Sequence, residues 1–85
     1  MTDLSATEAE ILRLTEAAGP GRSIAPADVA QSLLPGDAWR SQLSAVRRAA
    51  IRLAEAGRID ILRKGRPVDP AEARGVIRLR VRAPA

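Results

Sequence analysis

The chain has 85 residues, the size of one small domain, and it contains neither cysteine nor histidine. A domain of this size buries only about 60 to 65% of the surface that its unfolded chain exposes, so every large apolar residue counts. Disulfides and thiolate metal sites are excluded. No apolar run approaches the roughly 20 residues that span a bilayer, and the N-terminus does not resemble a secretory signal. We expect one cytoplasmic domain over residues 1–85, with an ordered core at about residues 5–82.

Charge is divided unevenly along the chain. Residues 1–37 carry two basic and six acidic side chains, a net charge of −4, and residues 38–85 carry twelve basic and four acidic ones, a net charge of +8. A molecule polarised in this way either presents its basic side to an anionic partner or pairs its two halves internally. The sequence leaves both possibilities open.

Two helices are predicted in the acidic half. Ser5 with Glu8, and Thr7 with Glu10, match the capping box that satisfies free amides at a helix start. Apolar residues then recur at helical spacing, so a helix is expected over about residues 7–18, with its acids facing solvent. A second helix is expected from residue 26 to 33 or 34, with proline at its first position. The stretch between the helices is long enough only for an edge strand.

A longer third helix is predicted over residues 37–57, between Asp37 as N-cap and Gly57 as a left-handed C-terminal stop. At about 100° per residue, its apolar side chains fall on one face, which must be buried. That inner face consists of Trp39, Leu43, Val46, Ala50, Leu53 and Ala54. The link from the second helix spans about three or four residues, which is typical of helix-turn-helix geometry.

After Gly57 the apolar period changes from about 3.6 to 2, which predicts two half-buried strands, at residues 59–62 and 77–82. The connection, residues 63–75, has a charged Lys-Gly-Arg tip, and Asp69 is expected to cap one helical turn inside it. A hairpin connection of this length is a wing. The elements together predict an α+β fold, a winged helix-turn-helix domain with three helices plus a small antiparallel hairpin with a wing loop.

Two groups of arginines have structural interpretations. Arg47 borders the inner face of the third helix and is expected to hold Asp60, Asp28 or helix-end carbonyls. Some arginines of the last strand are expected to pair with Asp60 across the hairpin. The interpretation we favour for this strand is that its charges prevent strand-to-strand aggregation. These arginines are Arg78, Arg80 and Arg82.

Several short segments match a known sequence pattern. They are Trp39-Arg40, Val46-Arg47, residues 53–57 and 64–70, and Gly75 with Ile77-Arg78-Leu79. With them the chain resembles, over about residues 11–80, a small bacterial family catalogued as domain of unknown function 3253. The most specific part is the wing, with Gly65, Val68, Asp69, Pro70 and Gly75. The resemblance implies a winged-helix-like fold and no catalytic or binding residues. The chain departs from the pattern at Ala25, which leaves the cap of the second helix in question, and at Val76.

The main functional hypothesis is binding of double-stranded DNA, with the third helix as recognition helix and the wing touching an adjacent groove or phosphates. Arginine suits this role because its fork binds both guanine edges and phosphates. The candidate residues are Arg40, Ser41, Ser44, Arg48 and Arg52 on the helix, with Lys64 and Arg66 on the wing.

A protein-interaction module of uncharacterised role is the alternative. Glu55 lies on the same helix face and repels phosphate, while Ile51 beside it suggests a packed contact. Winged helices serve in many protein assemblies, and a fold does not by itself define a function. The partner, DNA or protein, therefore stays open at this point, as does the oligomeric state.

Catalysis finds no support in the sequence. Without histidine or cysteine, an acid, base or nucleophile must come from other residue types, and no motif gathers them. Asp69 and Glu72 are too few ligands for a metal and are more simply part of a capped turn. We expect no enzyme activity, no cofactor and no bound metal.

Overall fold

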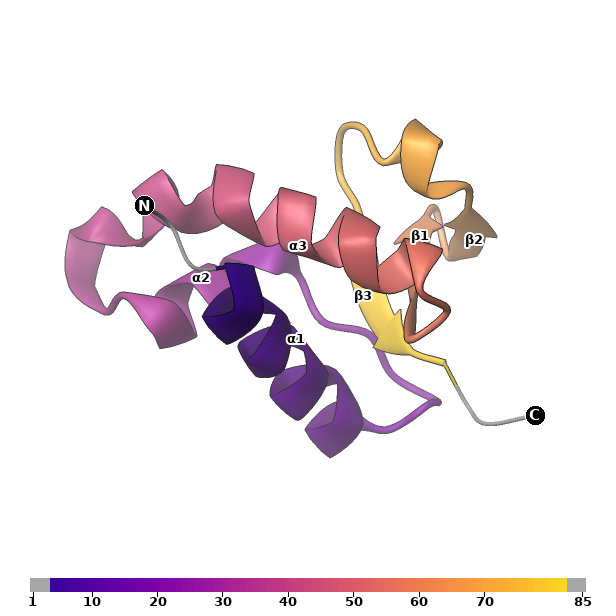
Figure 1. Cartoon of the computed structure of the whole chain (residues 1–85), viewed down its shortest axis with the longest axis horizontal. Helices are drawn as coiled ribbons and strands as arrows, with labels where there is room; N and C mark the ends of the chain where they lie inside the picture. Colours follow the sequence, from indigo (N-terminus) through magenta and orange to yellow (C-terminus); the bar gives the residue numbers. More distant parts are fainter. Residues whose placement is uncertain (1–3, 83–85) are drawn as a thin grey trace.

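The computed structural model describes residues 4–82, which form an α+β structure of three helices and one antiparallel sheet (Figure 1). The helices are α1 (Leu4–Ala18), α2 (Pro26–Leu33) and α3 (Leu43–Glu55). The strands are β1 (Ile59–Arg63), β2 (Arg66–Val68) and β3 (Arg78–Val81), and two 3₁₀ turns are η1 (Gly36–Gln42) and η2 (Pro70–Glu72). The predicted fold class is confirmed, and the arrangement is compatible with a winged-helix-like fold.

The core lies where the helices meet the sheet. α3 packs against α1, α2 and β1, and α1 also contacts β3. The largest fully buried side chains come from all of these elements and are Ile11, Ile59, Ile61, Leu79, Val29, Val46 and Thr15. Burying one such apolar side chain contributes about 1.5 to 3 kcal/mol, so the small core depends on each of them.

The sheet has the strand order β2-β1-β3. Ile61 of β1 lies opposite Val68 on one side and opposite Leu79 on the other. Ile24, between α1 and α2, pairs with Leu79 through two backbone hydrogen bonds of 2.8 Å. The edge strand expected before the second helix is thus reduced to a single bridge.

The wing contains a strand that the sequence did not predict, because residues 66–68 form β2. Lys64 and Gly65 both have positive φ, 51° and 79°, which is the geometry of a two-residue turn that matches the twist of its flanking strands. The turn brings Arg63 opposite Arg66 in the β1–β2 register. The sequence predicted a two-stranded hairpin with a long wing loop. The structure instead has a three-stranded sheet, with a tight turn between β1 and β2.

The rest of the wing returns to α3. Asp69 accepts a hydrogen bond from the backbone N–H of Ala71 at 2.9 Å, so the predicted cap of one helical turn is confirmed. η2 packs against α3, and Arg47 of α3 donates to the carbonyl of Gly75 at 2.9 Å. Arg47 has a structural role as expected, but its partner is a loop carbonyl and not Asp60, Asp28 or a helix-end carbonyl.

The start of the first helix differs from the prediction. α1 already includes Leu4, so Ser5 and Thr7 lie inside the helix and are not its N-caps. Thr7 is only 4% exposed. Two capping-box patterns overlap in this segment, and the pattern alone does not show which hydroxyl faces the core. At α2, the carboxylate of Asp28 accepts the backbone N–H of Ala25 at 2.9 Å, which is one half of a capping box, and the methyl group of Ala25 cannot supply the other half.

The start of the third helix is the largest departure. Residues 36–42 form the 3₁₀ turn η1, α3 begins only at Leu43, and Asp37 makes no capping bond. A 3₁₀ segment turns about 120° per residue instead of 100°, so the direction of Trp39 shifts by about 80° relative to α3. Trp39 is consequently half-buried against the edge of the core. The predicted inner face holds for Val46, Ala50 and Leu53, and Gly57, with φ of 77°, ends the helix as expected.

The arginines of β3, and Arg82 directly after it, are engaged within the structure. Asp60 of β1 forms ion pairs with Arg80 at 3.2 Å and with Arg82 at 2.8 Å, and Arg78 donates to Ser23. Burial raises the pKa of Asp60, but the hydrogen bonds from Arg82 and Arg80 outweigh it and leave that pKa below its ordinary value. The expected cross-strand pairing is confirmed, and two of these arginines tie the strands together.

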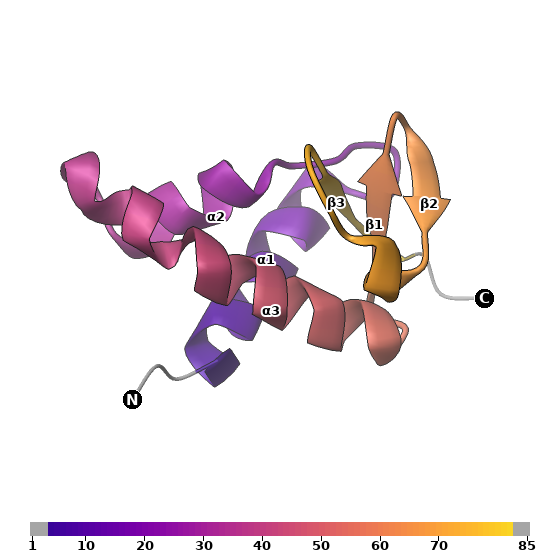
Figure 2. The ribbon, with the colours of Figure 1, turned by 90° about the horizontal axis from the view of Figure 1, so that it is seen from above.

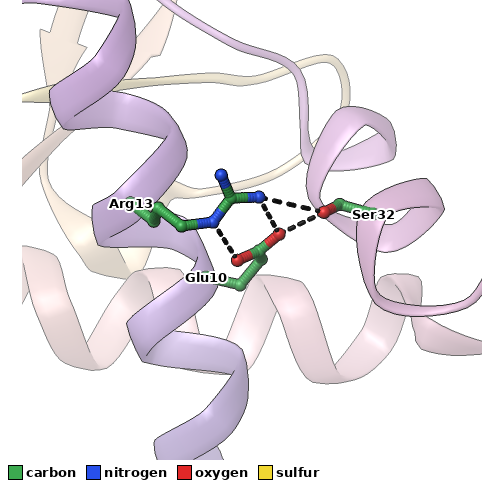
Figure 3. Close-up of polar contacts among 3 residues, drawn as sticks. All are labelled: Glu10, Arg13 and Ser32. Carbon is green, nitrogen blue, oxygen red and sulfur yellow. Dashed lines mark hydrogen bonds and ion pairs between the residues drawn. The ribbon is translucent and has the colours of Figure 1, made fainter.

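Glu10 joins the first two helices. It accepts hydrogen bonds from Arg13 of α1, at 2.7 and 2.6 Å, and from the hydroxyl of Ser32 of α2 (Figure 3). The sequence placed this acid on a solvated face, but the fold brings Ser32 to it. The hydrogen bonds from Arg13 and then Ser32 lower the pKa of Glu10 to about 2.

Replacing Glu10 by glutamine tests this link. Because the folded pKa lies below the unfolded value, the carboxylate stabilises the fold fully above about pH 5 and loses this effect as the pH falls toward 2. We expect Glu10→Gln to lower the free energy of unfolding by about 1 kcal/mol at pH 7, since the pair is near solvent. Urea unfolding of both proteins between pH 7 and pH 2.5 measures this difference, which should shrink with acid. A difference that is constant across this range contradicts the assignment.

Candidate nucleic-acid interface

The outer face of α3 carries a row of polar side chains at four-residue spacing. Ser44, Arg48 and Arg52 lie in this row and are all exposed. Spacing of four residues places side chains one above the other along a helix. The structure therefore brings three of the predicted contact residues together on one line, which we call the α3 row.

The cations of the α3 row differ in their partners. Arg52 forms an ion pair of 3.4 Å with Glu8 of α1, although its side chain is still 61% exposed. Within residues 4–82, Arg48 has no carboxylate within ion-pair distance. Arg48 is thus the cation of the row that is most available to a phosphate, while Glu8 competes for Arg52.

The two candidates that precede α3 lie in η1 and have local contacts. The guanidinium of Arg40 lies over the ring of Trp39, 4.7 Å from its centroid. The hydroxyl of Ser41 donates to the carbonyl of Ala38 at 2.7 Å. Both are exposed, but the 3₁₀ geometry turns them away from the line of the α3 row.

The wing candidates form a second cluster. Lys64 and Arg66 are exposed at the β1–β2 turn, and the register places Arg63 beside Arg66. Arg63 was not among the sequence candidates. The sequence contained the signal needed to identify it. Lys64-Gly65 is a two-residue turn, and such a turn makes the residues on either side of it, Arg63 and Arg66, neighbours.

The two clusters lie on different parts of the molecule. Figure 2 shows β1 leaving the C-terminal end of α3 and running away from it, so that the β1–β2 turn lies at the far end of the strands. The returning part of the wing, η2, packs against α3, and Arg47 of α3 binds the carbonyl of Gly75. The cations of the α3 row and those of the β1–β2 turn therefore lie at two separate places on the molecule.

Two residues that weighed against a phosphate contact have distinct positions. Ile51 is half-buried and packs against the core cluster, so it does not interrupt the outer face. Glu55 is exposed in the last turn of α3, close to the C-terminal end of the α3 row. The negative charge of Glu55 shifts the most favourable anion position toward Ser44 and Arg48.

Residues 4–82 contain neither a metal-ligand cluster nor a membrane-spanning helix. No group of three or more Asp, Glu, His or Cys side chains is arranged to hold a metal ion in this part of the chain. Among the described helices, none combines the length and the apolar character needed to cross a bilayer.

Comparison with known proteins identifies the family. No curated protein matches the chain. The model of the family described as "Protein of unknown function (DUF3253)" matches residues 5–82, which include every helix and strand except the first residue of α1. This agrees with the resemblance found in the wing and in the third helix. The chain therefore belongs to the DUF3253 family.

Proposed function

We propose that this protein binds double-stranded DNA, with the α3 row as its primary contact. The proposal rests on the exposed row Ser44, Arg48 and Arg52 on the outer face of α3, whose opposite face packs against α1, α2 and β1. Helices of this kind enter the major groove, where arginine binds guanine edges or phosphates. Arg40 and Ser41 contribute from η1, the 3₁₀ turn that precedes α3.

The wing adds a separate phosphate contact in this proposal. Lys64 and Arg66, with Arg63, concentrate positive charge at a tight turn that projects from the sheet. Phosphate contacts position a protein on a duplex without reading its sequence. The protein acts by binding rather than by catalysis, and access to chromosomal DNA requires a location in the bacterial cytoplasm.

Salt dependence of binding tests the proposal. Fluorescence anisotropy with a labelled mixed-sequence duplex measures the association constant at several salt concentrations. Its logarithm should fall linearly with the logarithm of the salt concentration, with a slope of about −3 for three or four neutralised phosphates. A single-stranded oligonucleotide of the same length is the comparison. Absence of binding to the duplex at low salt contradicts the proposal, as does equal affinity for the single strand.

A further inference from the structure

Val76 is the most exposed large apolar residue in the described part of the chain. Its side chain is 89% exposed, and within residues 4–82 the other exposed large apolar side chain is Leu34, at 36%. Single exposed apolar residues are common, but an apolar residue that stands between hollows often marks a binding surface. Whether Val76 marks a binding surface therefore depends on the hollows and side chains around it.

Two hollows adjoin Val76. The first, of about 480 Å³, lies between the β1–β2 turn and Ser23 and has Leu62 in its lining. The second, of about 400 Å³, lies between the start of α2, Leu43 and Ile77. Both volumes fall in the range of about 300 to 1,000 Å³ that holds ligands. Because Val76 lines both hollows, they form one extended apolar surface, which we call the Val76 groove.

The charged residues that line the Val76 groove are all cations. They are Arg63, Lys64 and Arg78 at the first hollow and Arg47 at the second. Within residues 4–82, none of these four has a carboxylate within ion-pair distance.

Two of these cations are also held in place by the fold. Arg78 donates from Nε and Nη2 to the hydroxyl and carbonyl of Ser23, at 2.7 and 2.8 Å, and Arg47 is held by the carbonyl of Gly75. The groove thus combines an apolar floor with fixed positive charges.

We propose that the Val76 groove binds an acidic, extended segment of a partner protein that carries apolar side chains. Apolar side chains of the segment fill the two hollows on either side of Val76, and its carboxylates meet the cations at the rim. A small anion inside one hollow leaves most of Val76 uncovered, whereas an extended peptide covers it. Charge complementarity of this type accelerates association and selects among partners.

A second copy of this chain is a poorer occupant than a different protein. Two of the acids of α1 are already engaged, since Glu8 pairs with Arg52 and Glu10 with Arg13, and the third described acid, Glu16, lies on a helix and not on an extended segment. The exposed apolar residue of the acidic half, Leu34, is only 36% exposed. The occupant needs acids and apolar side chains along one extended segment.

Short synthetic peptides test the proposal. The probe alternates glutamate pairs with single leucines, and its controls replace every leucine by serine or every glutamate by lysine. We expect the probe to shift the amide NMR signals of Gly65, Val76 and Ile77, and not those of the α3 row. We expect each control peptide to bind at least about tenfold more weakly in fluorescence anisotropy.

Variants of the chain localise the binding. Val76→Ser should weaken binding of the probe at least about tenfold, since an exposed anchor is lost, while Leu34→Ser, the matched control, leaves it unchanged. DNA affinity should be the same in both variants, which separates this test from that of the DNA proposal. Equal binding of the serine control peptide, shifts confined to the α3 row, or concentration-dependent dimerisation that Val76→Ser abolishes would overturn the proposal.

Discussion

Leu79→Ala is expected to lower the free energy of unfolding by about 2 to 5 kcal/mol, enough to remove much of the stability of a domain of this size. Leu79 is fully buried, lies opposite Ile61 in the sheet, and pairs by its backbone with Ile24. The truncation leaves a cavity at the junction of helices and sheet, where neighbours on both sides are held by hydrogen bonds and relax little. Thermal unfolding should show a decrease in Tm of about 10 °C or more.

The control for Leu79→Ala is Val76→Ala. It removes an apolar side chain that is 89% exposed, so the free energy of unfolding should change by less than about 0.5 kcal/mol. Trp39→Ala should lie between the two, because the ring is half-buried. If Trp39→Ala destabilises as much as Leu79→Ala, the 3₁₀ start of the third helix is misplaced.

Replacing Arg48 and Arg52 together by alanine is expected to weaken duplex binding by about tenfold to a hundredfold and to reduce the salt slope by about 2. The proposed contact loses two charges from one line of α3. Stability should change little, since Arg48 has no ion pair in the described chain and the exposed Arg52–Glu8 pair is worth at most about 1 kcal/mol. Anisotropy titrations at several salt concentrations, with circular dichroism melts, measure both quantities.

Arg22→Ala and Glu8→Gln sharpen this test. Arg22 is an exposed arginine between α1 and α2, away from the α3 row, so Arg22→Ala serves as the control for Arg48→Ala with the same charge change. Glu8→Gln removes the competitor of Arg52 and should raise the affinity for the duplex by about two- to fivefold. If Arg22→Ala weakens binding as much as Arg48→Ala, the binding reflects net charge and not the α3 row.

Pairing between the two charged halves accounts for only part of the ion pairs in residues 4–82. Glu8 of the acidic half pairs with Arg52 of the basic half, whereas Asp60 neutralises Arg80 and Arg82 within the basic half itself. The internal partner of a surface charge depends on which elements are neighbours in space. A charge count along the sequence contains no such information.

Features that depend on local chemistry could be predicted from the amino-acid sequence alone. Proline and glycine residues bound α2, and Gly57 ends α3. Asp69 caps the 3₁₀ turn η2, and apolar periodicity distinguishes the helices from the strands. Each of these follows from the backbone and side-chain preferences of a few neighbouring residues. The α+β class and the order of elements were accessible for the same reason.

Only the tertiary structure decided where the side chains of the candidate surfaces lie relative to one another. The 3₁₀ start of the third helix rotates Trp39 and Arg40 away from the face that a uniform helical wheel assigns them. The direction of β1 separates the cations of the wing from those of α3, and the return of the wing creates the Val76 groove. These features depend on packing between segments far apart in the chain, which local patterns do not encode.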